Sequence, residues 1–305
     1  MKHPAEQISG ILLLDKPEGL SSNAALQRTR RALGADKAGH VGSLDPLATG
    51  MLPVCLGEAT KVAGELVGGR KRYRFAVRLG AATATGDREG DVIETGPVPD
   101  LERGSIEAVL ERFRGVQPQV PPMYSALKRD GRPLYELARA GLEVERAPRT
   151  IEIGELTLRT LEPDTLELDL LCSKGTYVRV LAADIARALG SCGHVVRLRR
   201  LCVEPFASEA MITLEALEAD CRAGRRPALM APDEALAALP RIAFAAPEAA
   251  RIVHGQAVRT TSSSVSGRVR LYDDRGRFLG LGEADGAGFV RPKRLFSLWQ
   301  GWASE

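Results

Sequence analysis

The sequence lacks any apolar run as long as the roughly 18 residues that a membrane-spanning helix requires. Near the N-terminus, only residues 11–14 form an apolar run before Asp15 and Lys16, which is too short for the core of a signal peptide. We therefore expect no membrane span and a cytoplasmic protein. With 305 residues, of which 44% are hydrophobic, the chain can bury a substantial core without covalent cross-links.

Cysteine and histidine are scarce and scattered. The five cysteines include no Cys-x-x-Cys pair, and their odd number argues against a disulfide framework. The four histidines likewise lack the spacing of metal ligands. His40 stands where a phosphate loop needs lysine, and residues 280–282 lack the third glycine of a dinucleotide-binding motif. We therefore expect no metal site and no cofactor.

The net charge is also small, at +3, so charge alone does not identify a nucleic-acid-binding protein. Its distribution is more informative, because residues 241–305 contain ten basic and six acidic side chains, whereas residues 1–240 contain 32 and 33. Arginine outnumbers lysine by 34 to 8, and its planar guanidinium suits phosphates and base edges. A preference for arginine codons in a GC-rich genome would explain that bias equally well.

Hydrophobic periodicity predicts an α+β fold. Residues 72–79 alternate strictly, with Tyr73 and Phe75 on an apolar face and arginines on the other, as in a half-buried strand. Ser21 is a typical helix N-cap and Gly34 a typical stop, which predicts a helix between them. Further strands are expected at 151–158, 165–172 and 194–203, and further helices at 105–114, 178–189 and 213–239, the last with a break near Pro227.

Two central segments depart from this pattern, and the sequence pattern changes again near the C-terminus. Residues 117–122 contain three prolines, so we expect no regular structure there. Residues 123–148 are polar, basic and punctuated by glycine, which predicts a long excursion from the core. After Pro240, short β-like runs alternate with glycine-rich turns. We therefore expect a domain over 1–240 with a mostly antiparallel mixed sheet, and a small β-rich domain over 241–305.

One isolated carboxylate marks the segment most suggestive of chemistry. Within residues 38–61, Asp45 is the only acid before Glu58, and it lies between Gly42 and Pro46. Glycine permits a tight turn and proline stiffens it, so we expect the carboxylate on a rigid loop. A purely structural turn, in which Asp45 caps a neighbouring amide, explains the Leu-Asp-Pro tripeptide by itself more simply.

Longer motifs change that balance. Residues 39–53, GHVGSLDPLATGMLP, closely resemble the signature that carries the nucleophilic aspartate of the TruB family of pseudouridine synthases. The other matching segments, in chain order, are a Lys-Pro motif at 14–19, a tyrosine-bearing strand at 71–74, the start of an RNA-gripping thumb at 122–128, a tyrosine and arginine motif at 172–179, a pocket-lining strand at 194–201 and a PUA-like tail. The resemblance covers residues 8–303 and implies a pseudouridine synthase catalytic domain with flanking helices, a thumb insertion at about 123–148 and a PUA-like RNA-binding domain.

The resemblance also implies roles for single residues. Asp45 would be the catalytic nucleophile, and Arg179 would pair with it, since an adjacent guanidinium favours the charged form of a carboxylate. Tyr73 would stack on a flipped uracil and Leu198 would pack against its other side, although both also fit an ordinary core. Tyr177 lies two residues before Arg179, a spacing that lets both side chains point into one site.

Other candidates are substrate-binding rather than catalytic. His40 would help to hold the flipped nucleotide and not act as a general base. Lys16 and Lys61 would support the site or face phosphates. The candidate RNA-backbone contacts of the thumb are Lys128, Arg129 and Arg132, although a solvated basic loop would explain them as well. The C-terminal candidates are Arg291, Lys293 and Arg294.

The reaction implied breaks the N1–C1′ bond of a uridine and joins C5 to C1′, an isomerisation without cofactor or metal. By resemblance the substrate is uridine 55 in the TΨC arm of tRNA, modified by a monomer without guide RNA. One alternative is a tRNA-binding folding chaperone without essential catalysis, which the presence of both Asp45 and Arg179 argues against. Another is a guide-RNA-dependent synthase, which the chain length and the thumb-like segment disfavour.

Overall fold

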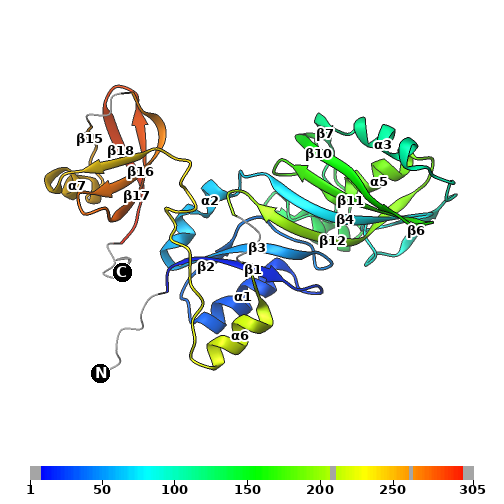
Figure 1. Ribbon diagram of the computed structural model, residues 1–305, viewed down its shortest axis with the longest axis horizontal. Helices are drawn as coiled ribbons and strands as arrows, with labels where there is room; N and C mark the ends of the chain where they lie inside the picture. Colours follow the sequence, from blue (N-terminus) through cyan, green and yellow to red (C-terminus); the bar gives the residue numbers. More distant parts are fainter. Residues whose placement is uncertain (1–7, 207–210, 261–263, 298–305) are drawn as a thin grey trace.

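The computed structural model describes residues 8–206, 211–260 and 264–297. Its largest element is a nine-stranded mixed sheet with the order β13-β1-β3-β12-β4-β11-β10-β7, and β2 pairs with β3 beside this path (Figure 1). Within this sheet, only the β1–β13 and β3–β12 pairs are parallel, which confirms the predicted α+β class. The strands are β1 Gly10–Lys16, β2 Ala38–His40, β3 Thr49–Leu56, β4 Lys71–Leu79, β7 Gly115–Gln119, β10 Arg149–Leu161, β11 Thr165–Cys172, β12 Gly193–Val203 and β13 Ile212–Thr213.

Four helices contribute to the larger hydrophobic core on one face of this sheet. They are α1 Ser22–Leu33, α3 Arg103–Glu111, α5 Val178–Ala188 and α6 Leu214–Arg222. The start of α1 is fixed by Ser21, whose hydroxyl accepts a hydrogen bond from the Ala24 amide at 3.1 Å. Its end is fixed by Gly34 in the left-handed region, at φ 68°, where glycine has no steric penalty. Both caps were predicted from the sequence.

Strand β1 is buried on both faces, so its residues alternate between two cores. Leu12 and Leu14 belong to the core with α1 and α6, whereas Ile11 and Leu13 belong to a second cluster. That cluster also contains residues of η1 Gly57–Val62 and α2 Ala63–Leu66. A continuous apolar run such as 11–14 is what a strand covered on both sides requires.

The C-terminal strands form a separate five-stranded sheet that covers this second cluster. It is the orange sheet at the upper left of Figure 1, and its strand order is β14-β16-β17-β18-β15. Leu281 and Phe296 belong to the same hydrophobic cluster as Ile11 and Leu13. The C-terminal sheet therefore lies against the side of β1 and β3 opposite to α1 and α6. Its elements are β14 Arg241–Phe244, α7 Ala246–Val253, β15 Val258–Arg259, β16 Ser266–Asp273, β17 Phe278–Asp285 and β18 Phe289–Leu295.

Three segments differ from the sequence-based expectation. Residues 115–119 form strand β7 despite Pro118, because β7 is an edge strand that pairs only with β10 and can spare one donor. The predicted helix 213–239 ends at Arg222, and no helix is assigned to residues 223–239. The predicted excursion contains short regular elements, namely β8 Lys128–Arg129, β9 Arg132–Pro133 and α4 Leu134–Arg139.

A two-stranded sheet of β5 Ala81–Thr83 and β6 Val92–Thr95 completes the fold next to β12. The turn between these two strands carries residues 84–91, which approach the candidate site. Among the residues described, no helix is both long and apolar enough to cross a membrane.

Candidate active site

Asp45 lies in the loop between β2 and β3, and neighbouring segments hold that loop by its backbone. The Ser22 hydroxyl accepts from the Leu44 amide at 2.7 Å and donates to the Leu44 carbonyl at 2.9 Å. On the other side of Asp45, the Gly19 amide donates to the Pro46 carbonyl at 2.8 Å. The backbone is thus fixed immediately before and after Asp45, which leaves its side chain little freedom to reposition.

Two buried cations reinforce the same loop. Lys16 is fully buried, and its ammonium donates to the carbonyls of Pro17, Leu20 and Pro46 at 2.8, 2.6 and 3.3 Å. Burial lowers the pKa of Lys16 to about 8, against a partial opposing effect of Asp45. A side chain enclosed in this way supports the loop from behind and does not face solvent.

Arg200 performs a similar task from β12. It is 1% exposed, and its guanidinium donates to the carbonyls of Met51, Gly42 and Ser43 at 2.7, 2.9 and 3.3 Å. Gly50 lies directly opposite, where a Cβ would come within 2.2 Å of the Arg200 carbonyl oxygen. Glycine at this position, with φ 98°, allows β3 and β12 to approach closely.

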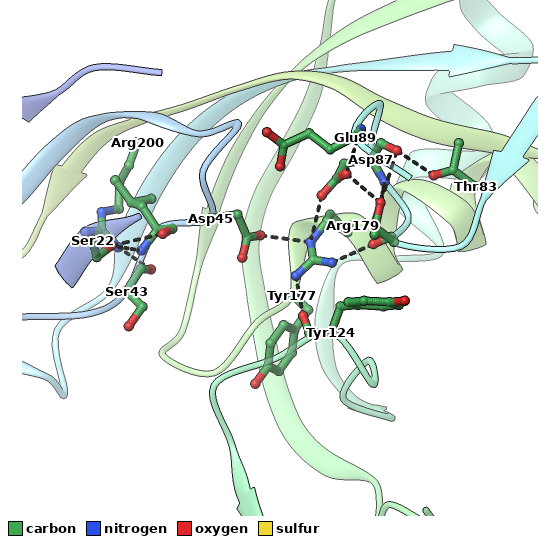
Figure 2. A network of polar contacts seen from close by, with 12 residues as sticks. Ser22, Ser43, Asp45, Thr83, Asp87, Glu89, Tyr124, Tyr177, Arg179 and Arg200 are labelled. Atoms are coloured by element: carbon green, nitrogen blue, oxygen red, sulfur yellow. Dashed lines mark hydrogen bonds and ion pairs between the residues drawn. The ribbon is translucent and has the colours of Figure 1, made fainter. Parts of the chain in front are cut away.

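The centre of the site is a cluster of one arginine and two aspartates. Arg179 Nε donates to Asp45 Oδ2 at 2.8 Å and lies 3.6 Å from Asp87 Oδ2, so the guanidinium lies between the two carboxylates (Figure 2). The side chains of Arg179 and Asp87 are 5% and 4% exposed, whereas that of Asp45 is 38% exposed. The pairing that the sequence suggested is present, but the buried partner is the arginine and not the aspartate.

The remaining donors of Arg179 are satisfied by backbone carbonyls. Nη1 donates to the Thr85 carbonyl at 2.5 Å. Nη2 donates to the carbonyl of Tyr124, which is labelled in Figure 2, at 2.7 Å. Asp87 is held in turn, because its Oδ1 accepts from the Thr85 hydroxyl at 2.6 Å and the Glu89 amide at 3.0 Å. Arg179 therefore ties the Asp45 loop, the 84–91 turn and the start of the thumb segment to the first turn of α5.

The aromatic and apolar candidates come from three further elements. Tyr73 on β4 and Leu198 on β12 are 8% and 7% exposed, and Leu198 pairs in register with Phe75. Burial raises the pKa of Tyr73 and of Tyr177. Tyr177 precedes α5, where its amide donates to Gln119 Oε1 at 2.8 Å and its carbonyl accepts from Gln119 Nε2 at 3.1 Å. The amide side chain of β7 thus anchors the segment that carries Tyr177 and Arg179.

His40 lies at the end of β2 with a buried Nδ1 that has no hydrogen-bond partner. Burial, together with the nearby Arg200, lowers the pKa of His40. An imidazole of this kind is neutral at pH 7.

The other basic candidates lie apart from this cluster. The Lys61 ammonium contacts Glu58 Oε2 at 2.5 Å and the Leu295 carbonyl at 2.8 Å, so it joins η1 to the C-terminal sheet. Lys128, Arg129 and Arg132 are exposed on the β8–β9 hairpin. Arg291, Lys293 and Arg294 are exposed on β18.

Sequence reasoning did not single out Asp87, Gln119 or Arg200. Asp87 falls in a Gly-Asp-Arg-Glu-Gly turn, a pattern typical of any surface turn, so nothing local marked it. Gln119 was in the segment wrongly expected to be irregular. Arg200 belongs to a strand with several arginines, and no periodicity distinguishes the buried one from the others.

The arrangement presents one half-exposed carboxylate, oriented by a buried guanidinium, near the buried Tyr73 and the partly exposed Tyr177. A carboxylate so placed can act as a nucleophile or a base on a molecule that enters from solvent. Among the described residues, no group of three or more histidine, cysteine, aspartate or glutamate side chains could hold a metal ion.

Comparisons with known proteins agree with this architecture. Three family models match in succession: TruB family pseudouridylate synthase (N terminal domain) over residues 30–178, tRNA pseudouridylate synthase B C-terminal domain over 179–236, and Pseudouridine synthase II TruB, C-terminal, over 240–296. A tRNA pseudouridine synthase B from Aromatoleum aromaticum is 52% identical over 297 residues, which cover 97% of this chain and 95% of that protein. A second, from Stutzerimonas stutzeri, is 48% identical and covers 97% and 98%. Among solved structures, a Cbf5-Nop10-Gar1 complex contains a chain with a TM-score of 0.70 and 26% identity, over 92% of this chain and 79% of that one.

Proposed function

The chain belongs to the TruB family of tRNA pseudouridine synthases, and from this premise we propose that it converts uridine 55 in the TΨC loop of tRNA to pseudouridine, with Asp45 as the nucleophile. The observation that supports this role most directly is the Asp45–Arg179 pair at 2.8 Å. Asp45 is half-exposed on a loop held by Ser22 and Gly19, so it is accessible and fixed at once.

The chemistry that Asp45 must support is an isomerisation. The N1–C1′ bond of the uridine breaks, a C5–C1′ bond forms, the C5 proton leaves to solvent and N1 takes up a proton. Attack on C1′, attack on C6 of the base and proton abstraction leading to a glycal all require one ionised carboxylate beside the nucleotide. Arg179 orients that carboxylate through a charge-assisted hydrogen bond and keeps it apart from Asp87.

Binding requires the target uridine to leave its stacked position, which costs a few kcal/mol. In this proposal Tyr73 stacks on the extruded uracil, where one base–aromatic contact contributes about 1–3 kcal/mol. Tyr177 and Leu198 complete the pocket, and His40 contacts the flipped nucleotide. Lys16 supports the Asp45 loop from behind through the Pro46 carbonyl.

The remaining RNA contacts are proposed for two exposed basic surfaces. The β8–β9 hairpin of the thumb insertion presents Lys128, Arg129 and Arg132 to the RNA backbone. A PUA-like domain over 241–305 follows the catalytic domain over 1–240, and the exposed basic side chains of β18 contact RNA outside the loop. Lys61 acts at the joint between these two parts, through the Leu295 carbonyl. The enzyme works as a monomer without guide RNA.

The decisive experiment measures tritium release from a tRNA transcript labelled at C5 of its uridines, with wild-type protein and with Asp45→Asn. We expect release by the wild type alone, while the variant still binds tRNA. A transcript with cytidine at position 55 carries no label there, and it should release no tritium from its remaining uridines if position 55 is the target. Release by Asp45→Asn at the wild-type rate would refute the assignment of the nucleophile.

A tRNA-folding chaperone is the second function that this chain could perform, because RNA gripping and release do not require the Asp45 carboxylate. The same pair of proteins distinguishes the two. A folded wild-type protein that binds tRNA but releases no tritium, even at enzyme excess, would favour the chaperone or a synthase that depends on a partner.

A further inference from the structure

An ion pair between Glu18 and Arg88 links two segments that flank the candidate nucleophile. Glu18 belongs to the turn between β1 and α1, and Arg88 follows Asp87 in the turn between β5 and β6. A guanidinium nitrogen of Arg88 contacts a carboxylate oxygen of Glu18, and another donates to the Val196 carbonyl at 3.2 Å. The two side chains are 45% and 50% exposed, so the pair is reachable from solvent.

This pair closes a ring of contacts around the Asp45–Arg179 interaction. Gly19, the neighbour of Glu18, donates its amide to the carbonyl of Pro46, the neighbour of Asp45. Asp45 accepts from Arg179, and Arg179 lies 3.6 Å from Asp87, the neighbour of Arg88. Each residue named is thus either bonded to the next along the chain or in contact with it across space. We call this closed path the aspartate ring.

The two turns that carry the ion pair follow different strands, β1 for Glu18 and β5 for Arg88. The 84–91 turn is fixed to β12, because the Arg88 amide donates to the Val195 carbonyl at 2.9 Å and the Val195 amide donates to the Gly86 carbonyl at 3.0 Å. The turn with Glu18 instead follows β1 and is joined to the Asp45 loop by the Gly19–Pro46 hydrogen bond, while Arg200 of β12 holds that loop at Gly42 and Ser43. Between the two halves, the ring closes through Arg179 on one side and through Glu18–Arg88 on the other.

We propose that Glu18 and Arg88 are positioning residues, whose ion pair fixes the Asp45 half of the aspartate ring against the Asp87 half. The inference rests on the proposed role of Asp45. Loss of the pair leaves Arg179 as the remaining side-chain link of the ring, so the Asp45 carboxylate spends less time in its reactive orientation. The effect belongs to the chemical step and not to RNA affinity.

The size of the effect is bounded by the exposure of the pair. Exposed ion pairs are weak and are screened by salt, so removal of one partner should lower kcat about two- to fivefold and leave KM unchanged. The decrease should shrink at high salt, where screening weakens the pair in the wild type as well. A general loss of folding stability would not produce this salt dependence.

The test compares Glu18→Gln, Arg88→Gln, the double variant and the charge-exchanged Glu18→Arg/Arg88→Glu protein in steady-state tritium release from tRNA. We expect the double variant to be no slower than either single variant, because one interaction is lost in each. The exchanged protein should recover at least half of the wild-type kcat. Glu155→Gln is the matched control, since Glu155 pairs with Arg72 at a similar exposure on the sheet and should leave kcat unaltered.

Three results would overturn the proposal. Wild-type kcat in both single variants would remove any positioning role. A raised KM with unchanged kcat for Arg88→Gln, together with a weaker salt dependence of binding, would make Arg88 an RNA phosphate contact instead. Additive losses without recovery on charge exchange would mean that the two residues act separately. If Asp45→Asn stays active the proposed nucleophile itself fails, whereas an inactive Asp45→Asn with unaffected pair variants refutes only the positioning role.

Discussion

Replacement of Arg179 by lysine tests how the guanidinium orients the proposed nucleophile, because it keeps the positive charge and removes the planar group with several donors. The three side-chain nitrogens of Arg179 donate to Asp45, to the Thr85 carbonyl and to the Tyr124 carbonyl, in three directions. A lysine ammonium is a single point donor on a flexible stem, so it can keep one of these directions but not all three. We expect the Asp45 carboxylate to lose its fixed orientation.

The expected decreases in kcat and in stability follow from the hydrogen bonds that are lost. A hydrogen bond to a charged group contributes about 1.5–3 kcal/mol, which corresponds to about a 10- to 150-fold decrease in kcat if Asp45 must be oriented in the transition state. The two carbonyls that lose their donor are partly buried, so the free energy of unfolding should also fall, by about 2–3 kcal/mol. KM for tRNA should change little, since Arg179 is 5% exposed and faces the protein.

The assay is single-turnover tritium release at saturating enzyme, with urea denaturation of the same samples. Arg187→Lys is the matched control: it is the same substitution on the same helix, at a side chain that is 66% exposed and paired with Asp184. A single-turnover rate constant for Arg179→Lys within about fivefold of the wild type, the range expected of an exposed ion pair, would contradict this prediction. A positive charge near Asp45 would then suffice for activity, without the hydrogen-bonding geometry of the guanidinium.

Three further predictions concern the groups around this pair. Asp87→Asn should lower the free energy of unfolding by about 1–3 kcal/mol in urea denaturation and reduce kcat, because the carboxylate 3.6 Å from the buried Arg179 is lost. Unchanged values for both would show that Asp45 and the two backbone carbonyls suffice to hold Arg179. Lys16→Met should alter the pH dependence of stability. In the folded protein the pKa of Lys16 is lowered from 10.5 to about 8, so the unfolded chain binds more protons than the folded one between these two pH values. The free energy of unfolding of the wild type therefore rises with pH in this range. The variant should lack this component, at most about 1.4 kcal/mol per pH unit, and parallel wild-type and variant curves from pH 8 to 10 would contradict the shift. Gly50→Ala should destabilise the protein by about 2–3 kcal/mol, since the new Cβ would lie 2.2 Å from the Arg200 carbonyl oxygen, and an unaltered urea midpoint would disprove the tight β3–β12 approach.

Local patterns in the sequence were sufficient for most elements of the fold. The alternation at 72–79 predicted β4, and the Ser21 and Gly34 caps predicted both ends of α1. The prediction was wrong at β7, because prolines exclude a central strand but not an edge strand, and edge position depends on the whole sheet order. It was also wrong after Arg222, where an alanine- and leucine-rich composition favours helix but no helix forms.

In the candidate site, too, the residues in long local motifs were predicted and the others were not. Asp45 and Arg179 were found because they belong to long motifs, and the structure places them 2.8 Å apart. Asp87 and Gln119 were not found, because each lies in a short stretch whose composition suits any turn or irregular segment. The catalytic and binding roles of all these residues are still predictions that the variants above will test.

The alternation of the strands, the caps of α1 and the family signature around Asp45 could all be predicted without a structure, since these features depend on residues that are neighbours along the chain. The burial of Arg179 and Asp87, and the partial exposure of Asp45, depend instead on the folded arrangement. So does the packing of the C-terminal sheet on the face of β1 opposite to α1. The physical reason is that burial and ion pairing depend on which distant segments meet. Asp45, Asp87 and Arg179 come from three loops or helix ends that are brought together only when the whole sheet has formed.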